Sequence, residues 1–166
     1  AGTMHGLVHS SPWTVTQTCP TRVTLETWIG PGTPRPWLGS GRLQLDYELD
    51  DQSLTMRLGI TAVEGGWPAA LGFHPWFRRR LEGHSGAARY AYSPQARLIL
   101  VDQRWPRKPT EDLGPYPHDD LFIALPAPPE IHWPTGIGLR LEADADVWVI
   151  YERDAHGFCI EPWTDV

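Results

Sequence analysis

Two segments of the sequence carry side chains that suit proton transfer. His74 lies in the largely aromatic run Gly-Phe-His-Pro-Trp-Phe, residues 72–77, whose rings could wall a pocket. Because imidazole titrates at about pH 6.5, such a histidine can donate and recover a proton near neutrality. Glu161 follows an apolar run and precedes Pro162, which we expect to turn the chain at a strand end. Partial burial beside Trp163 would raise the pKa of this carboxylate toward that of a useful general base.

These residues also have plainer structural explanations. His74 could be a packed histidine whose ring nitrogens bond to the backbone, and Glu161 could be an exposed residue at a strand end. Two other groups are ambiguous in the same way. Asp119 and Asp120 can bind sugar hydroxyls or a cation, or they can cap backbone amides at the start of an element. The basic run 78–80 can meet a phosphate or form a solvated strand end.

Motifs of other catalytic classes are missing from the sequence. Seven histidines are present, but there is no HExxH motif and no CxxC pair, so we expect no metal site. Neither GxGxxG nor a P-loop occurs, so we expect no nucleotide and no other cofactor. Cys159 has no neighbouring base, which argues against a thiol nucleophile. We expect Cys19 and Cys159 to be reduced, buried thiols, with a single bridge as the alternative.

The elements that must position these residues are predicted to be β-strands, because apolar and polar residues alternate with a period of two. The segments expected to be strands are 13–18, 22–29, 42–49, 54–60, 87–92, 96–101, 138–142, 147–151 and 158–161. Helical periodicity is nearly absent; residues 121–125 come nearest to it, and Pro126 ends that run. Glycine and proline cluster at 30–41, 65–68, 105–117 and 126–134, which predicts long loops. The pattern indicates one all-β domain, residues 1–166, built as a sandwich or barrel.

Composition excludes several classes of protein. With 41% hydrophobic and 20% charged residues, the chain is not of the disordered type. A net charge of −6 argues against a nucleic-acid or anionic-membrane partner, both of which need a basic surface. No apolar run is long enough to span a membrane, and no signal peptide is visible, so we expect a cytoplasmic protein. We also expect a monomer. Nine tryptophans suit the binding of sugars or other flat apolar faces.

Four motifs, taken together and in order, resemble those of the aldose 1-epimerase (galactose mutarotase-like) family. The segment His5-Gly6-Leu7-Val8, followed by a Pro-Trp pair, is similar to the first, and residues 72–77 match the most specific one. The last two are matched by residues 119–122, Asp-Asp-Leu-Phe, and by residues 160–164, Ile-Glu-Pro-Trp-Thr. The matches run from residue 5 to residue 164, nearly the whole chain.

The resemblance implies a β-supersandwich fold and assigns roles to the matched residues. It makes His74 the general acid and Glu161 the general base of a carbohydrate isomerase. His5 and Asp119 would hold sugar hydroxyls, with Asp120 as the substitute if the register is shifted by one. It implies a small sugar substrate, with neither cofactor nor metal.

Two tryptophans beside these motifs, Trp76 and Trp163, are expected to supply apolar walls for the sugar ring. Because family members are longer on both sides of the matched region, we expect the chain to be truncated at both ends, with an incomplete sandwich. Two other interpretations remain open: a hexose-6-phosphate 1-epimerase, which would need basic residues at the pocket, and a non-catalytic sugar-binding β-sandwich.

Overall fold

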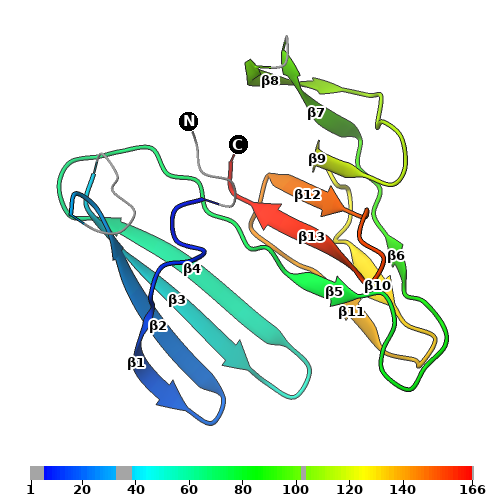
Figure 1. The fold of residues 1–166 in the computed structure, drawn as a ribbon, viewed down its shortest axis with the longest axis horizontal. Coiled ribbons are helices and arrows are strands. Elements are labelled where there is room, and N and C mark those ends of the chain that lie inside the picture. The colour runs from blue at the N-terminus through cyan, green and yellow to red at the C-terminus, as the bar shows by residue number, and fades with distance from the viewer. Residues whose placement is uncertain (1–5, 33–38, 102–103, 166) are drawn as a thin grey trace. The chain divides into compact units, whose positions relative to one another are not determined.

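The computed structural model describes residues 6–32, 39–101 and 104–165, and every regular element in these ranges is a β-strand (Figure 1). The chain forms two compact units, residues 1–69 and 70–166, which we call unit N and unit C. The strands of unit N are β1 (Thr14–Cys19), β2 (Arg22–Ile29), β3 (Gly41–Leu49) and β4 (Leu54–Ala62). Those of unit C are β5 (Trp76–Arg78), β6 (Arg89–Ala91), β7 (Ala96–Val101), β8 (Arg104–Thr110), β9 (Asp119–Ile123), β10 (Glu130–His132), β11 (Gly138–Arg140), β12 (Val147–Tyr151) and β13 (Gly157–Trp163). In the described ranges there is no helix long and apolar enough to cross a membrane.

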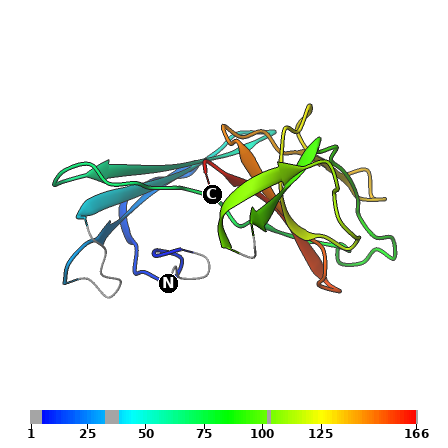
Figure 2. The same cartoon turned by 90° about the horizontal axis from the view of Figure 1, so that it is seen from above.

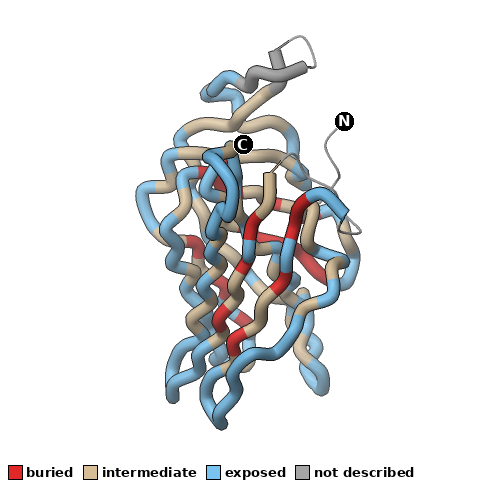
Figure 3. Tube along the Cα trace, turned by 90° about the vertical axis from the view of Figure 1, so that its left-hand side faces the viewer, coloured by how far each residue is buried: buried red, intermediate tan, exposed pale blue. Residues whose placement is uncertain are grey.

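Unit N is an antiparallel meander in the order β1-β2-β3-β4. Directly paired residues share a face of the sheet, so the row Leu25, Leu45 and Leu58 shows that the apolar positions of three strands coincide. Buried residues occur in β2 and β3, whereas β1 and the β1–β2 and β3–β4 turns are exposed (Figure 3). The two-residue period of the sequence therefore sets which face of unit N is apolar.

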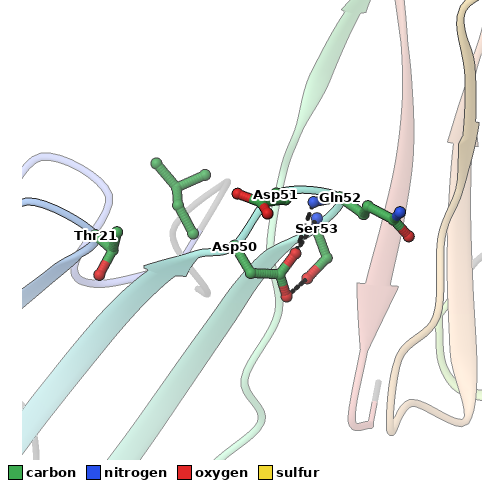
Figure 4. Close-up of a pocket in the computed structure, with 6 residues that line it drawn as sticks. Thr21, Asp50, Asp51, Gln52 and Ser53 are labelled. Atoms are coloured by element: carbon green, nitrogen blue, oxygen red, sulfur yellow. Dashed lines mark hydrogen bonds between the residues drawn. The ribbon is translucent and has the colours of Figure 1, made fainter.

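The β3–β4 turn is closed by its own side chains. The carboxylate of Asp50 accepts hydrogen bonds from the backbone amides of Gln52 and Ser53, both at 2.7 Å, and from the Ser53 hydroxyl. These bonds lower the pKa of Asp50. A pocket at this turn is lined by Thr21, Leu49 and residues 50–53 (Figure 4). The side chains of Asp50 and Ser53 bond within the turn itself and stabilise the hairpin.

Unit C contains a six-stranded sheet, β5-β13-β12-β9-β7-β8, and a three-stranded sheet, β11-β10-β6. Strand β13 (red), which carries most of the C-terminal motif, pairs with β12 (orange) inside the larger sheet (Figures 1 and 2). Side chains from the two sheets form one apolar core. The core residues are Phe122, Ile131, Trp133, Trp148, Ile150, Phe158 and Ile160. This packing fixes which face of β13 remains for chemistry.

Most expected strands are present, and β7 and β12 have the expected bounds. Residues 119–123 form strand β9, so the nearest approach to a helical pattern, at 121–125, is not a helix. Strand β8 lies in a segment predicted to be a loop; its two prolines are tolerated because it is an edge strand. The turn expected at Pro162 is wrong, because β13 continues to Trp163.

Both cysteines are free. Cys159 is buried, as expected, whereas Cys19 at the end of β1 is exposed, which corrects the expectation that both are buried.

Candidate functional site

Strand β13 presents two chemically different faces. Phe158 and Ile160 point into the core of unit C and are fully buried. Because side chains alternate along a strand, Cys159 and Glu161 lie on the opposite face. We call this face of the six-stranded sheet the site face. Its members come from neighbouring strands, because directly paired residues share a face.

A row of side chains crosses the site face. Cys159 pairs with Trp76 on β5 and with Tyr151 on β12, and Tyr151 pairs in turn with Asp119 on β9. Glu161 lies two residues beyond Cys159 along β13. Four strands thus bring together residues that are distant in sequence. The row could have been derived from the alternation in the sequence only if the strand partners were known.

The backbone holds the His74 segment against the end of β13. Leu71 and Thr164 form two hydrogen bonds: the Leu71 amide donates to the Thr164 hydroxyl at 3.0 Å, and the Thr164 amide donates to the Leu71 carbonyl at 2.8 Å. The Phe73 amide donates to the carbonyl of Pro162 at 3.1 Å. Pro162 lacks an amide donor but keeps its carbonyl, which is the group that bonds to the neighbouring segment here. These hydrogen bonds place His74 next to Glu161.

Gly72 is required by the same arrangement. A Cβ atom at this position would lie 2.6 Å from Cδ1 of Trp163, far inside van der Waals contact. The glycine thus lets the indole pack directly against the backbone. Trp163 in turn forms a side-chain hydrogen bond with Glu161. Its position predicts a role in orienting the carboxylate, beside the expected role as a wall for a sugar ring.

His74 and Glu161 contact each other. Nε2 of His74 lies 3.3 Å from Oε1 of Glu161, and their side chains are 35% and 4% exposed, respectively. The imidazole is therefore open to solvent on one side, whereas the carboxyl group is enclosed. The ring of Trp76 stacks on that of His74, with the two centroids 5.9 Å apart. Tyr151 contacts Trp76 edge-on, with a centroid distance of 5.7 Å. Trp76 is 56% exposed and offers an aromatic surface beside the pair.

Burial raises the pKa of Glu161 from its ordinary value of 4.5 to about 7. The hydrogen bond with Trp163 opposes this shift, and the negative charge of Asp119 adds to it. The carboxyl group consequently exchanges its proton near neutral pH, in contact with an imidazole.

The two adjacent aspartates lie on opposite faces of β9. Asp119 is on the site face, where its carboxylate pairs with Arg153 at 3.3 Å. Asp120 points to the other face, where Arg97 binds it at 3.1 Å and His118 lies 3.7 Å away. Asp119 is therefore the better placed of the two to meet a ligand bound at Glu161. His5, the other expected sugar-binding residue, lies outside the described residues.

The basic run 78–80 is partly committed to the fold. The guanidinium of Arg79 donates hydrogen bonds to the backbone carbonyls of Glu152 and Asp154 and lies over the ring of Phe158. Such an arginine holds the loop after β12, so it is not a free anion-binding group.

Sequence reasoning missed three residues of the site face: Tyr151, Arg153 and Cys159. Cys159 is the most notable, because its Sγ, a ring nitrogen of His74 and a carboxylate oxygen of Glu161 all lie within 4.8 Å of one another. Burial and the nearby charges of Glu161 and Asp154 raise the pKa of its thiol to about 12. The three side chains offer one nitrogen, one sulfur and one oxygen donor to a common point.

Comparison with known proteins adds a family and a fold. The family model described as aldose 1-epimerase matches residues 1–109. A galactose mutarotase related enzyme from Lactobacillus acidophilus superposes with a TM-score of 0.73 at 14% identity, covering 99% of this chain and 63% of that one. A galactose mutarotase-like protein from Lactobacillus casei has a TM-score of 0.73 at 20% identity, covering 98% of this chain and 64% of that one. A protein from Synechocystis has a TM-score of 0.66 at 21% identity, covering 98% of this chain and 59% of that one.

These likenesses establish the fold class expected from the motifs, the galactose mutarotase-like β-supersandwich. The chain spans less than two thirds of the length of each of these three structures. No curated protein matches the chain.

Proposed function

Because this chain belongs to the aldose 1-epimerase family, we propose that its site interconverts the α and β anomers of an aldohexose by acid–base catalysis. The observation that carries the proposal is the contact between His74 and the buried Glu161, at 3.3 Å on the site face. This pair offers a donor and an acceptor of protons at one point, with an exposed aromatic surface, Trp76, beside it.

The reaction needs two proton transfers at neighbouring atoms. A base removes the proton from the anomeric hydroxyl O1 while an acid protonates the ring oxygen O5, and the C1–O5 bond breaks. The open-chain aldehyde rotates about C1–C2, and the ring closes on the other face with both transfers reversed. O1 and O5 are bonded to the same carbon, so the groups that serve them must also lie close together. The separation of His74 and Glu161 meets this requirement.

The protonation states follow from the environment of each group. Glu161, with a pKa of about 7, is partly ionised at neutral pH and can accept the O1 proton. In the reactive form the carboxylate is ionised and His74 carries the proton for O5. A base with a pKa near the working pH combines adequate ionisation with adequate proton affinity. No covalent intermediate is required.

Neighbouring side chains would hold the sugar. Trp76 stacks on His74 with one part of its surface and exposes the rest, which suits the apolar face of a pyranose. Asp119 lies on the same face and offers acceptors for hydroxyl groups, with Arg153 beside it as a donor. The expected contribution of His5 belongs to this proposal and rests on the resemblance of its motif.

The proposal is tested by polarimetry of freshly dissolved α-D-glucose and α-D-galactose. The wild type should accelerate the approach to anomeric equilibrium, and His74→Gln should reduce the acceleration by about 10²–10⁴-fold. His132→Gln, a change to an exposed histidine of unit C, serves as the matched control and should leave the rate unchanged. Sugar binding by a folded wild type without any acceleration would instead favour the non-catalytic sugar-binding protein.

A further inference from the structure

The cluster of Cys159 with the two proposed catalytic residues points to a second property of the site. We propose that His74, Cys159 and Glu161 form a zinc-binding site, and that Zn²⁺ bound there blocks the acid–base pair. The inference departs from the expectation of no metal site, which rested on the absence of local motifs. Here the ligands come from two distant segments of unit C, so no short motif could reveal them.

The donor set suits zinc. Zn²⁺ is bound in proteins by thiolate, imidazole and carboxylate groups, commonly with three protein ligands and one open position in an accessible site. Imidazole nitrogen, thiol sulfur and carboxylate oxygen lie within 4.8 Å of one another here. Ligand bonds of about 2.0–2.3 Å place the donors of a tetrahedral site less than twice that length apart, so the cluster would contract around the ion. The 3.3 Å between His74 and Glu161 already fits one edge of such a tetrahedron.

The surroundings hold two of the three donors in place. Cys159 and Glu161 are two residues apart on β13, which has a neighbouring strand on each side, and both residues are nearly fully buried. Their backbone is bonded to β12 on one side, and β5 pairs with Cys159 on the other. His74 is 35% exposed and leaves a route from solvent to the cluster. Such preorganisation reduces the ordering cost of binding an ion.

Binding would change the chemistry of each ligand in a defined way. The Cys159 thiol loses its proton to solvent as the Zn–S bond forms, and zinc coordinates the neutral imidazole of His74. The Glu161 carboxylate donates an oxygen lone pair to the ion. His74 can then no longer carry a proton to O5, and Glu161 can no longer accept one from O1. Zinc binding rests on the cluster alone, whereas the inhibition rests on the proposed epimerase function.

Cobalt provides a test of binding that does not depend on activity. Titration of the full chain with Co²⁺ should give one saturable site with a sulfur-to-cobalt charge-transfer band in the near ultraviolet, and Zn²⁺ should displace it. Cys159→Ala should abolish the band, whereas Cys19→Ala, a change to the exposed thiol of unit N, should preserve it. Loss of a single outer-shell partner costs about 10–100-fold in metal affinity, so loss of this ligand should weaken Zn²⁺ binding by more than about 100-fold.

Cys159→Ser, which keeps the size of the buried side chain, separates a lost ligand from a disturbed fold. It should have the circular dichroism and urea midpoint of the wild type, and should lose the cobalt band as well. In polarimetry, Zn²⁺ that inhibits the wild type should not lower the rate of either Cys159 variant, each compared with its own rate without zinc. Absence of the band in the wild type, or its persistence in a folded Cys159 variant, would overturn the zinc site. Zinc binding by a protein without epimerase activity would overturn the proposed function and leave the site standing.

Discussion

Replacing Glu161 by glutamine should stabilise the folded protein at alkaline pH. In the folded state the pKa of this carboxyl is about 7, against an ordinary value of 4.5, chiefly because burial disfavours its charge. The folded protein therefore binds this proton more tightly than the unfolded chain does. The contribution of Glu161 to stability is greatest below pH 4.5, falls as the pH rises toward 7, and stays lower above it. Glutamine has nearly the same shape and carries no charge, so it does not incur the free-energy cost of burying an ionised carboxylate.

The size of the effect follows from the two pKa values. A tenfold difference in proton affinity corresponds to about 1.4 kcal/mol, so the carboxylate costs up to about 3 kcal/mol above pH 7. Glu161→Gln should raise the free energy of unfolding by up to this amount at pH 8 and by almost nothing at pH 4. A gain of about 3 kcal/mol would correspond to an increase in Tm of roughly 6–12 °C for a chain of this size.

Urea denaturation followed by tryptophan fluorescence at pH 4, 6 and 8 measures this difference. Glu142→Gln is the matched control, because that side chain is 72% exposed and should show no comparable gain. A destabilised Glu161→Gln at pH 8, or a gain of equal size at pH 4 and pH 8, would refute the assignment of a buried, destabilising carboxylate.

Three other changes test separate parts of the account. Asp46→Asn should destabilise the protein by at most about 2 kcal/mol at pH 7, because hydrogen bonds lower the folded pKa of Asp46 from 3.8 to about 2. In urea titrations this difference should vanish as the pH falls from 4 toward 2. Gly72→Ala should cost about 1–3 kcal/mol, since its methyl group would meet Trp163, and thermal unfolding would show whether the site tolerates it. Asp119→Asn should lower the pKa of Glu161, because it removes a negative charge that raises it, and should shift the acidic limb of the kcat/KM profile to lower pH.

Local patterns were sufficient for much of the fold. Alternation predicted the bounds of β2, and the apolar run 147–151 predicted those of β12, most of whose residues are buried. The same reasoning missed β8, since its two prolines suggest a loop until the strand is known to lie at a sheet edge. It also placed a turn at Pro162, whose carbonyl in the structure accepts a hydrogen bond from Phe73.

The candidate site depends more strongly on tertiary pairing. His74 and Glu161 could be proposed from their immediate neighbours, because aromatic and apolar flanks indicate partial burial. The choice between Asp119 and Asp120 could not be made, since a shift of one residue in register exchanges the two faces. Cys159 could be placed beside His74 only through the pairing of β5 with β13. Contacts between distant segments carry no local signature.

The most direct test of the central claim is anomeric exchange at equilibrium, measured by NMR saturation transfer between the α and β H1 signals of D-glucose and D-galactose. The wild type should increase the exchange rate, and Glu161→Gln, shown to be folded by the urea experiment, should lower the catalysed rate by about 10²–10⁴-fold. Exchange catalysed equally well by folded Glu161→Gln would contradict the claim that His74 and Glu161 form the acid–base pair.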